Sequence, residues 1–161
     1  METLKEIVEH NVKSVPNKPF LGTRTRIVDA VTKEASFGLY EWRTQKQAYD
    51  DALALARYLE HYKLVPVTKN EEGTFRFISL YSKNRMEWVV SDLACILAGF
   101  TSVTLYDTLG KDSIEYILDQ TVIKTVLCSA DKIQNIVDLK MAGKIKTVTH
   151  IIYFDDFSGK E

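Results

Sequence analysis

The stretch FRFISLYSKNRMEWVVSDLACILAGFTSVTLYDTLG, residues 75–110, contains two short apolar runs separated by a longer segment with helical spacing. Residues 75–81 are rich in aromatic and β-branched side chains, which is typical of a strand. Residues 84–99 are apolar almost all round, which predicts a helix that is packed on more than one side. Residues 101–105 predict a second strand, so the stretch predicts the order strand, helix, strand.

The alternation of strands and helices continues to the C-terminal end of the sequence. A helix, a strand, a helix and a strand are predicted at residues 113–121, 124–129, 131–140 and 147–154. Only parallel neighbouring strands need helical crossovers, and near-continuous apolar strands are expected where helices cover both faces of a sheet. The predicted fold class is therefore α/β, a doubly wound and largely parallel sheet with helices on both faces. We expect a mixed or antiparallel edge.

The N-terminal part of the sequence predicts different elements. These are a helix, a short β-hairpin at the edge of the fold, a second helix and a polar loop, at residues 2–15, 25–31 with 37–42, 45–62 and 65–74. Three helix starts carry the capping-box pattern, in which two side chains satisfy orphaned backbone N–H groups: Thr44 with Gln47, Asn84 with Glu87, and Asp112 with Glu115. We expect residues 1–161 to form a single α/β unit.

The loop after the strand at residues 101–105 is the first candidate for a functional position. Tyr106, Asp107 and Thr108 stand there, just before Gly110. They could form a binding site, or only a turn and a helix cap. The turn explanation is favoured, with Asp107 and Thr108 bonding to local backbone N–H groups, Gly110 adopting a conformation that a Cβ would disfavour, and Asp112 capping the helix.

Charge and composition narrow the function classes. The chain has 161 residues, a net charge of −1 and a pI near 6.3, which argues against a general nucleic-acid binder. The lysines of residues 140–146 favour a solvated helix end over a binding patch. Cys95 and Cys128 stand inside apolar runs, so we expect two buried free thiols and an intracellular, reducing location.

Hydropathy predicts neither a signal peptide nor a transmembrane segment. The N-terminus METLKEIVEH is amphipathic and mixed in charge, without the basic start and apolar run of a signal peptide. The longest uncharged run, residues 93–106, is 14 residues long. That run falls short of the roughly 20 residues that a membrane-spanning helix needs.

The sequence lacks the short motifs of nucleotide and metal chemistry. No Walker A loop, G-x-G pair, H-E-x-x-H, C-x-x-C or G-x-S-x-G occurs, so we expect no catalytic, cofactor-binding or metal-binding residues in this chain. One acidic pair, Asp155 with Asp156, follows the last predicted strand and could hold Mg²⁺, as in a flavodoxin-like domain. A polar loop after the strand is the favoured explanation, because no third ligand can be assigned.

Two segments carry a family pattern. They are residues 81–110, with S-K-N-R-x-E-W and L-Y-D-T-L-G followed by I-E-Y-I, and residues 39–59, preceded by K-P-F-L-G-T-R at 18–24. Together they resemble the N-terminal region of eukaryotic long-chain fatty-acid–CoA ligases, members of the adenylate-forming superfamily. The sequence departs from the family at Thr104, where proline is usual, and at Gln45, where an aromatic residue is usual. Both departures concern backbone and packing.

The resemblance implies a fold and a reaction. The fold is part of the large N-terminal domain of an adenylate-forming enzyme. Such ligases activate a long-chain fatty acid with ATP and Mg²⁺ to an acyl-adenylate, and coenzyme A then takes the acyl group. The phosphate-binding loop, the adenine-binding motifs and the mobile C-terminal domain of these enzymes have no counterpart in the 161 residues. We therefore expect this chain to bind no cofactor and to be inactive by itself.

Two functional hypotheses remain open. In the first, the chain is the N-terminal fragment of a long-chain fatty-acid–CoA ligase. In the second, it is a truncated, non-catalytic structural or interaction subunit derived from the ligase fold. Either way we expect an exposed apolar face, covered by the remainder of the ligase chain or by a protein partner. The resemblance also implies fatty acid as the substrate of the full enzyme, no nucleic acid, and a location on the cytosolic face of a membrane of the endoplasmic reticulum, mitochondrion or peroxisome.

Overall fold

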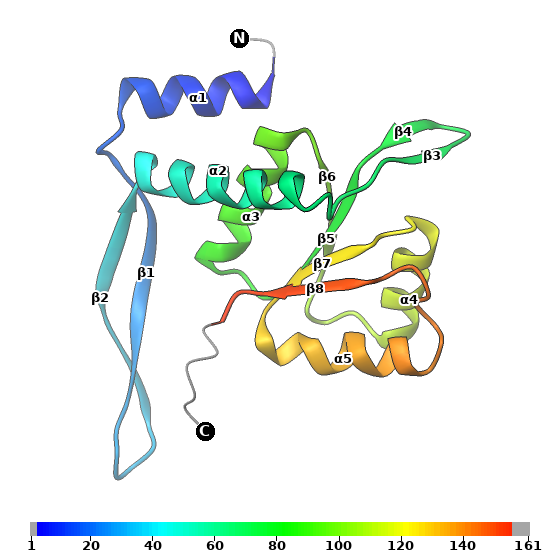
Figure 1. Ribbon diagram of the computed structural model, residues 1–161. Coiled ribbons are helices and arrows are strands. Elements are labelled where there is room, and N and C mark those ends of the chain that lie inside the picture. The colour runs from blue at the N-terminus through cyan, green and yellow to red at the C-terminus, as the bar shows by residue number, and fades with distance from the viewer. Residues whose placement is uncertain (1–2, 156–161) are drawn as a thin grey trace.

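The computed structural model describes residues 3–155 and, within them, every side chain except that of residue 70. A four-stranded sheet occupies the C-terminal half, in the order β6-β5-β7-β8 (Figure 1). All three strand pairs are parallel, which confirms the predicted sheet. The elements of this half are β5 (Phe77–Tyr81), α3 (Met86–Ala98), β6 (Thr101–Leu105), α4 (Lys111–Gln120), β7 (Thr125–Cys128), α5 (Ala130–Met141) and β8 (His150–Tyr153).

Helices cover both faces of the sheet, as predicted for a doubly wound fold. Side chains alternate along β7, so Leu127 points to the face covered by α3 and by α2 (Gln45–His61), whereas Val126 and Cys128 point to the face covered by α4 and α5. Figure 1 shows α2 and α3 on the upper side of the sheet and α4 and α5 on the lower side. Each face has its own apolar core, and the two central strands, β5 and β7, are buried between these cores.

The expected antiparallel edge is wrong for the part of the chain that the structure describes. The hairpin of β1 (Pro19–Val28) and β2 (Ala35–Thr44) forms a separate two-stranded sheet and does not pair with the parallel one. Both strands are longer than predicted, because polar and charged residues such as Thr23 and Arg43 take part in the antiparallel pairing. The hairpin extends away from the body of the molecule in Figure 1.

The N-terminal helices begin with intact capping boxes. The α2 prediction is confirmed: Gln47 N–H donates to Thr44 Oγ1 at 3.2 Å, and Thr44 N–H donates to Gln47 Oε1 at 2.9 Å. Helix α1 (Leu4–Ser14) has the same arrangement between Thr3 and Glu6. Each box satisfies two of the orphaned donors at its helix start.

The other two predicted capping pairs are wrong. Helix α3 has Arg85 at its N-cap and α4 has Gly110, and neither N-cap makes a side-chain capping hydrogen bond. Helix α3 starts two residues after Asn84, and Asp112 lies inside the first turn of α4. There its carboxylate complements the helix dipole rather than capping the helix.

The segment predicted as a polar loop, residues 65–74, contains a second small hairpin. It consists of β3 (Thr68–Asn70) and β4 (Gly73–Phe75), which pair in antiparallel fashion. Gly73 has φ of +151°, a conformation that favours glycine, and this lets the chain reverse within the hairpin. Strands of three residues are too short to produce a recognisable period in the sequence.

The two thiols are buried, as predicted, and this sets their reactivity. Cys95 lies in α3 and Cys128 ends β7, and both are free. Burial raises the pKa of each thiol to about 12, and Asp92 and Asp131, respectively, add to the rise. Because the thiolate is the reactive form, both cysteines should be inert in the native chain.

We therefore expect a thiol reagent such as DTNB to leave native Cys95 and Cys128 unmodified and to modify both rapidly in guanidinium. A Met141→Cys variant is the matched control, because residue 141 is 83% exposed and its thiol should react in the native state. Fast reaction of two native thiols would contradict the packing of α3 and β7.

Candidate functional site

The carboxyl end of the parallel sheet is the first place to look for a site. In the order β6-β5-β7-β8, the chain leaves β5 toward one edge strand and reaches β7 on the other side, which makes β5 and β7 a topological switch point. Ligands of open α/β sheets bind at such points, outside the carboxyl ends of the strands. Three polar segments meet there: the β5–α3 loop, the start of α5 and the short segment after β8 that contains Asp155.

Arg85 connects these segments. Its Nε donates to Glu87 Oε2 at 2.7 Å, and its Nη1 donates to Asp155 Oδ1 at 2.8 Å. The second oxygen of Asp155 accepts the N–H of Ala130 at 2.7 Å, at the first residue of α5. The guanidinium also lies 5.6 Å from the ring centroid of Phe154. We call Arg85, Glu87 and Asp155 the carboxyl-edge cluster.

The cluster is held in its charged state. The hydrogen bond from Arg85 to Glu87, helped by Asp155, raises the arginine pKa well above its ordinary value against the effect of burial. Burial raises the pKa of Glu87, but the bonds and charge of Arg85 outweigh it, and the net pKa is lowered. Burial likewise opposes ionisation of Asp155, and the Ala130 N–H and Arg85 more than reverse it, lowering its pKa. All three groups are charged at neutral pH.

A second polar group stands beside the cluster at the start of α5. Ser129 Oγ donates to Asp131 Oδ1 at 2.5 Å, and Lys132 Nζ lies 3.3 Å from the same carboxylate. The Ser129 bond is the main cause of the lowered pKa of Asp131. Lys132 also lies 5.6 Å from the ring centroid of Tyr81. Asp131 and Lys132 are therefore paired with each other, and this pairing is typical of a structural network of charges.

The acidic pair considered for Mg²⁺ is only partly described. Asp155 is engaged by Arg85 and by the Ala130 N–H, and Asp156 lies outside the described residues. Between residues 3 and 155 no three carboxylate, histidine or cysteine side chains gather as a metal ion would require. Asp155 therefore acts as a helix cap and an ion-pair partner.

The loop with Tyr106, Asp107 and Thr108 contains a turn, as favoured, but within residues 3–155 neither Asp107 nor Thr108 makes the expected side-chain hydrogen bond to a local backbone N–H. The Leu109 N–H donates to the Tyr106 carbonyl at 3.1 Å, and the Tyr106 side chain is 71% exposed. Asp107 lies 4.0 Å from the Lys83 ammonium, a weak surface pair. The special conformation expected of Gly110 is wrong, because its φ of −68° and ψ of 158° suit any residue.

A cleft of about 1560 Å³ separates the carboxyl-edge cluster from the β1–β2 hairpin. The hairpin supplies one wall, including Arg24, Phe37, Tyr40 and Trp42, and residues 83–87 with Asp155 contribute to the other. The sequence does not predict this cleft, because the alternating pattern of a hairpin does not determine which part of the fold the hairpin will face. The sequence does not predict the link from Arg85 to Asp155 either.

No helix among the described residues is long and apolar enough to cross a membrane.

Comparison with known sequences identifies relatives over nearly the whole chain. Residues 8–161 match the model of the family described as AMP-binding enzyme. Long-chain-fatty-acid–CoA ligase 5 of Rattus norvegicus is 31% identical over 160 residues, which is 96% of this chain and 21% of the relative. Long chain acyl-CoA synthetase 6, peroxisomal, of Arabidopsis thaliana is 30% identical over 134 residues, 83% of this chain and 17% of the relative.

Comparison with solved structures confirms the fold. The A-PCP didomain of carboxylic acid reductase from Segniliparus rugosus, in complex with AMP, superposes with a TM-score of 0.73 at 22% identity, covering 98% of this chain and 22% of that one. The fatty acyl CoA synthetase of Mycobacterium tuberculosis gives 0.70 at 17% identity, with 95% and 26% covered. The family match excludes the unrelated flavodoxin-like alternative. The chain spans about a fifth of the length of its relatives, and it belongs to the AMP-binding enzyme family.

Proposed function

We propose that this chain is the N-terminal segment of a long-chain fatty-acid–CoA ligase. The observation that carries the proposal is the match of residues 8–161 to the family, together with relatives at 30% and 31% identity whose names specify long-chain acyl-CoA synthesis. The motifs S-K-N-R-x-E-W and L-Y-D-T-L-G support the same branch of the family.

In the proposed full-length enzyme, the fatty-acid carboxylate oxygen attacks the α-phosphorus of ATP and displaces pyrophosphate, with Mg²⁺ balancing the phosphate charges. The coenzyme A thiolate then attacks the acyl carbonyl of the acyl-adenylate and displaces AMP. The described residues offer no glycine-rich cradle for phosphates, so the proposal assigns both chemical steps to residues outside this segment. Their part is a rigid framework, in which the parallel sheet and the carboxyl-edge cluster position the following polypeptide.

The reading frame beyond residue 161 is the direct test. We expect several hundred further codons, including a Ser/Thr/Gly-rich phosphate loop. A stop codon at that point would contradict the proposal and favour the truncated, non-catalytic subunit.

We expect the 161-residue chain to give only background ATP–pyrophosphate exchange with palmitate, and the full-length protein to exchange well above background. The reason is that the proposal assigns every phosphate-binding group to the following polypeptide. A lysate from cells that carry an empty vector sets the background. Exchange by the short chain would contradict this assignment.

The location of the full-length protein follows from the same proposal. Two free, buried cysteines fit a reducing, intracellular compartment. Three relatives are peroxisomal by name. We propose that the enzyme works at the cytosolic face of an organelle membrane, which subcellular fractionation of tagged full-length protein would test.

A further inference from the structure

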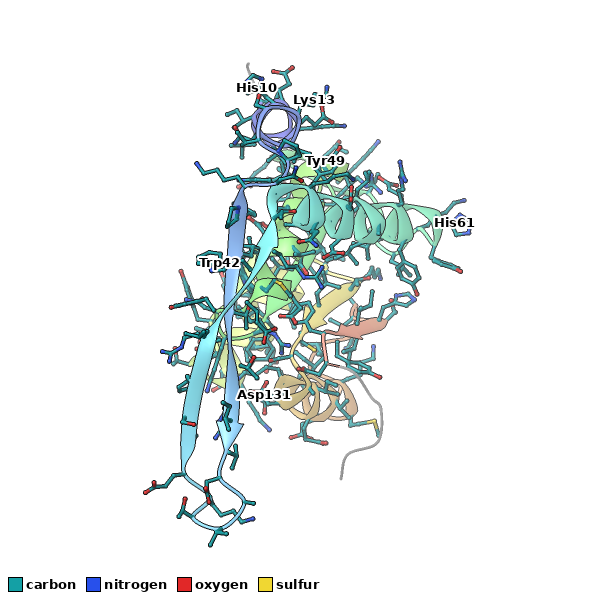
Figure 2. The ribbon with its side chains drawn as sticks, turned by 90° about the vertical axis from the view of Figure 1, so that its left-hand side faces the viewer. His10, Lys13, Trp42, Tyr49, His61 and Asp131 are labelled. Carbon is teal, nitrogen blue, oxygen red and sulfur yellow. The ribbon has the colours of Figure 1, made fainter. Side chains whose placement is uncertain are left out.

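We draw no further inference here: the strongest candidate, the exposed aromatic surface of the β1–β2 hairpin around Trp42 (Figure 2), which borders the cleft beside the carboxyl-edge cluster, carries nothing new, because its covering by the rest of the same large domain restates an established property of this protein family.

Discussion

Replacement of Leu127 by alanine is expected to lower the free energy of unfolding of the 161-residue chain by about 3 kcal/mol. Leu127 is fully buried in β7, which pairs with β5 on one side and β8 on the other. It belongs to the core on the α2 and α3 face, with Ile78, Leu80 and Cys95 among its neighbours. The alanine leaves a cavity that the flanking strands β5 and β8 cannot close, because both are held in place by their backbone hydrogen bonds to β7.

For a chain of this length, that loss should lower Tm by about 6 to 12 °C. Differential scanning calorimetry and urea unfolding at pH 7 would measure it. Leu39→Ala is the control, since Leu39 is 90% exposed and its truncation should change the stability by less than about 0.5 kcal/mol. Similar losses for the two variants would mean that β7 does not lie at the centre of the sheet.

The central position of β7 could be predicted from the sequence in outline. Four apolar runs separated by segments of helical length imply a parallel sheet with helical crossovers, and the predicted strand at residues 101–105 coincides with β6. The two separate cores also follow from side-chain alternation along buried strands. The order of strands in the sheet was not predicted, since it depends on which edge each crossover chooses.

The helix starts show where local patterns fail. The same Thr-x-x-Gln spacing succeeds at Thr44, whereas Asn84 and Asp112 fit the pattern and cap nothing. A cap requires an extended backbone at one particular residue, and the preceding loop decides which residue that is. At α4 the extended residue is Gly110, so Asp112 is carried into the helix.

Ion pairs between residues that are far apart in the chain could not be predicted from the sequence, for a different reason. Arg85 and Asp155 are 70 positions apart, and they meet only because β5 and β8 end at the same edge of the sheet. The sequence placed Asp155 after a strand, and two acidic neighbours there suggested a metal. In the structure, the positive charge beside Asp155 is that of Arg85, which comes from the β5–α3 loop.

Arg85→Met should be the most damaging single polar substitution at this edge, with an expected loss of about 1–2 kcal/mol at pH 7. Methionine replaces the apolar stem of the side chain but leaves Glu87 and Asp155 without their shared cation. Removing one partner of a buried pair costs more, but these side chains are 35% and 38% exposed, so water screens part of the loss.

The dependence of this loss on pH distinguishes the charge network from packing. The folded-state pKa values of Glu87 and Asp155 lie below their ordinary values of 4.5 and 3.8, so the network stabilises the native state above those values. That stabilisation disappears as the pH falls through the lowered folded-state values. In Arg85→Met, the arginine no longer opposes the effect of burial, so the folded-state pKa values of both carboxyls rise and the loss of stability in acid becomes smaller than in the unsubstituted chain.

Urea unfolding of the unsubstituted chain and of Arg85→Met should be compared between pH 7 and pH 3. The difference between their free energies of unfolding should be largest near neutral pH and should become smaller in acid. Arg43→Met is the matched control, because Arg43 pairs with Asp51 in an ion pair whose side chains are 44% and 45% exposed. That variant should lose less than about 0.5 kcal/mol at every pH. A gap for Arg85→Met that stays constant with pH would mean that the side chain acts through its contact with Phe154 alone, and that the three segments at the carboxyl edge are joined by packing instead of charge.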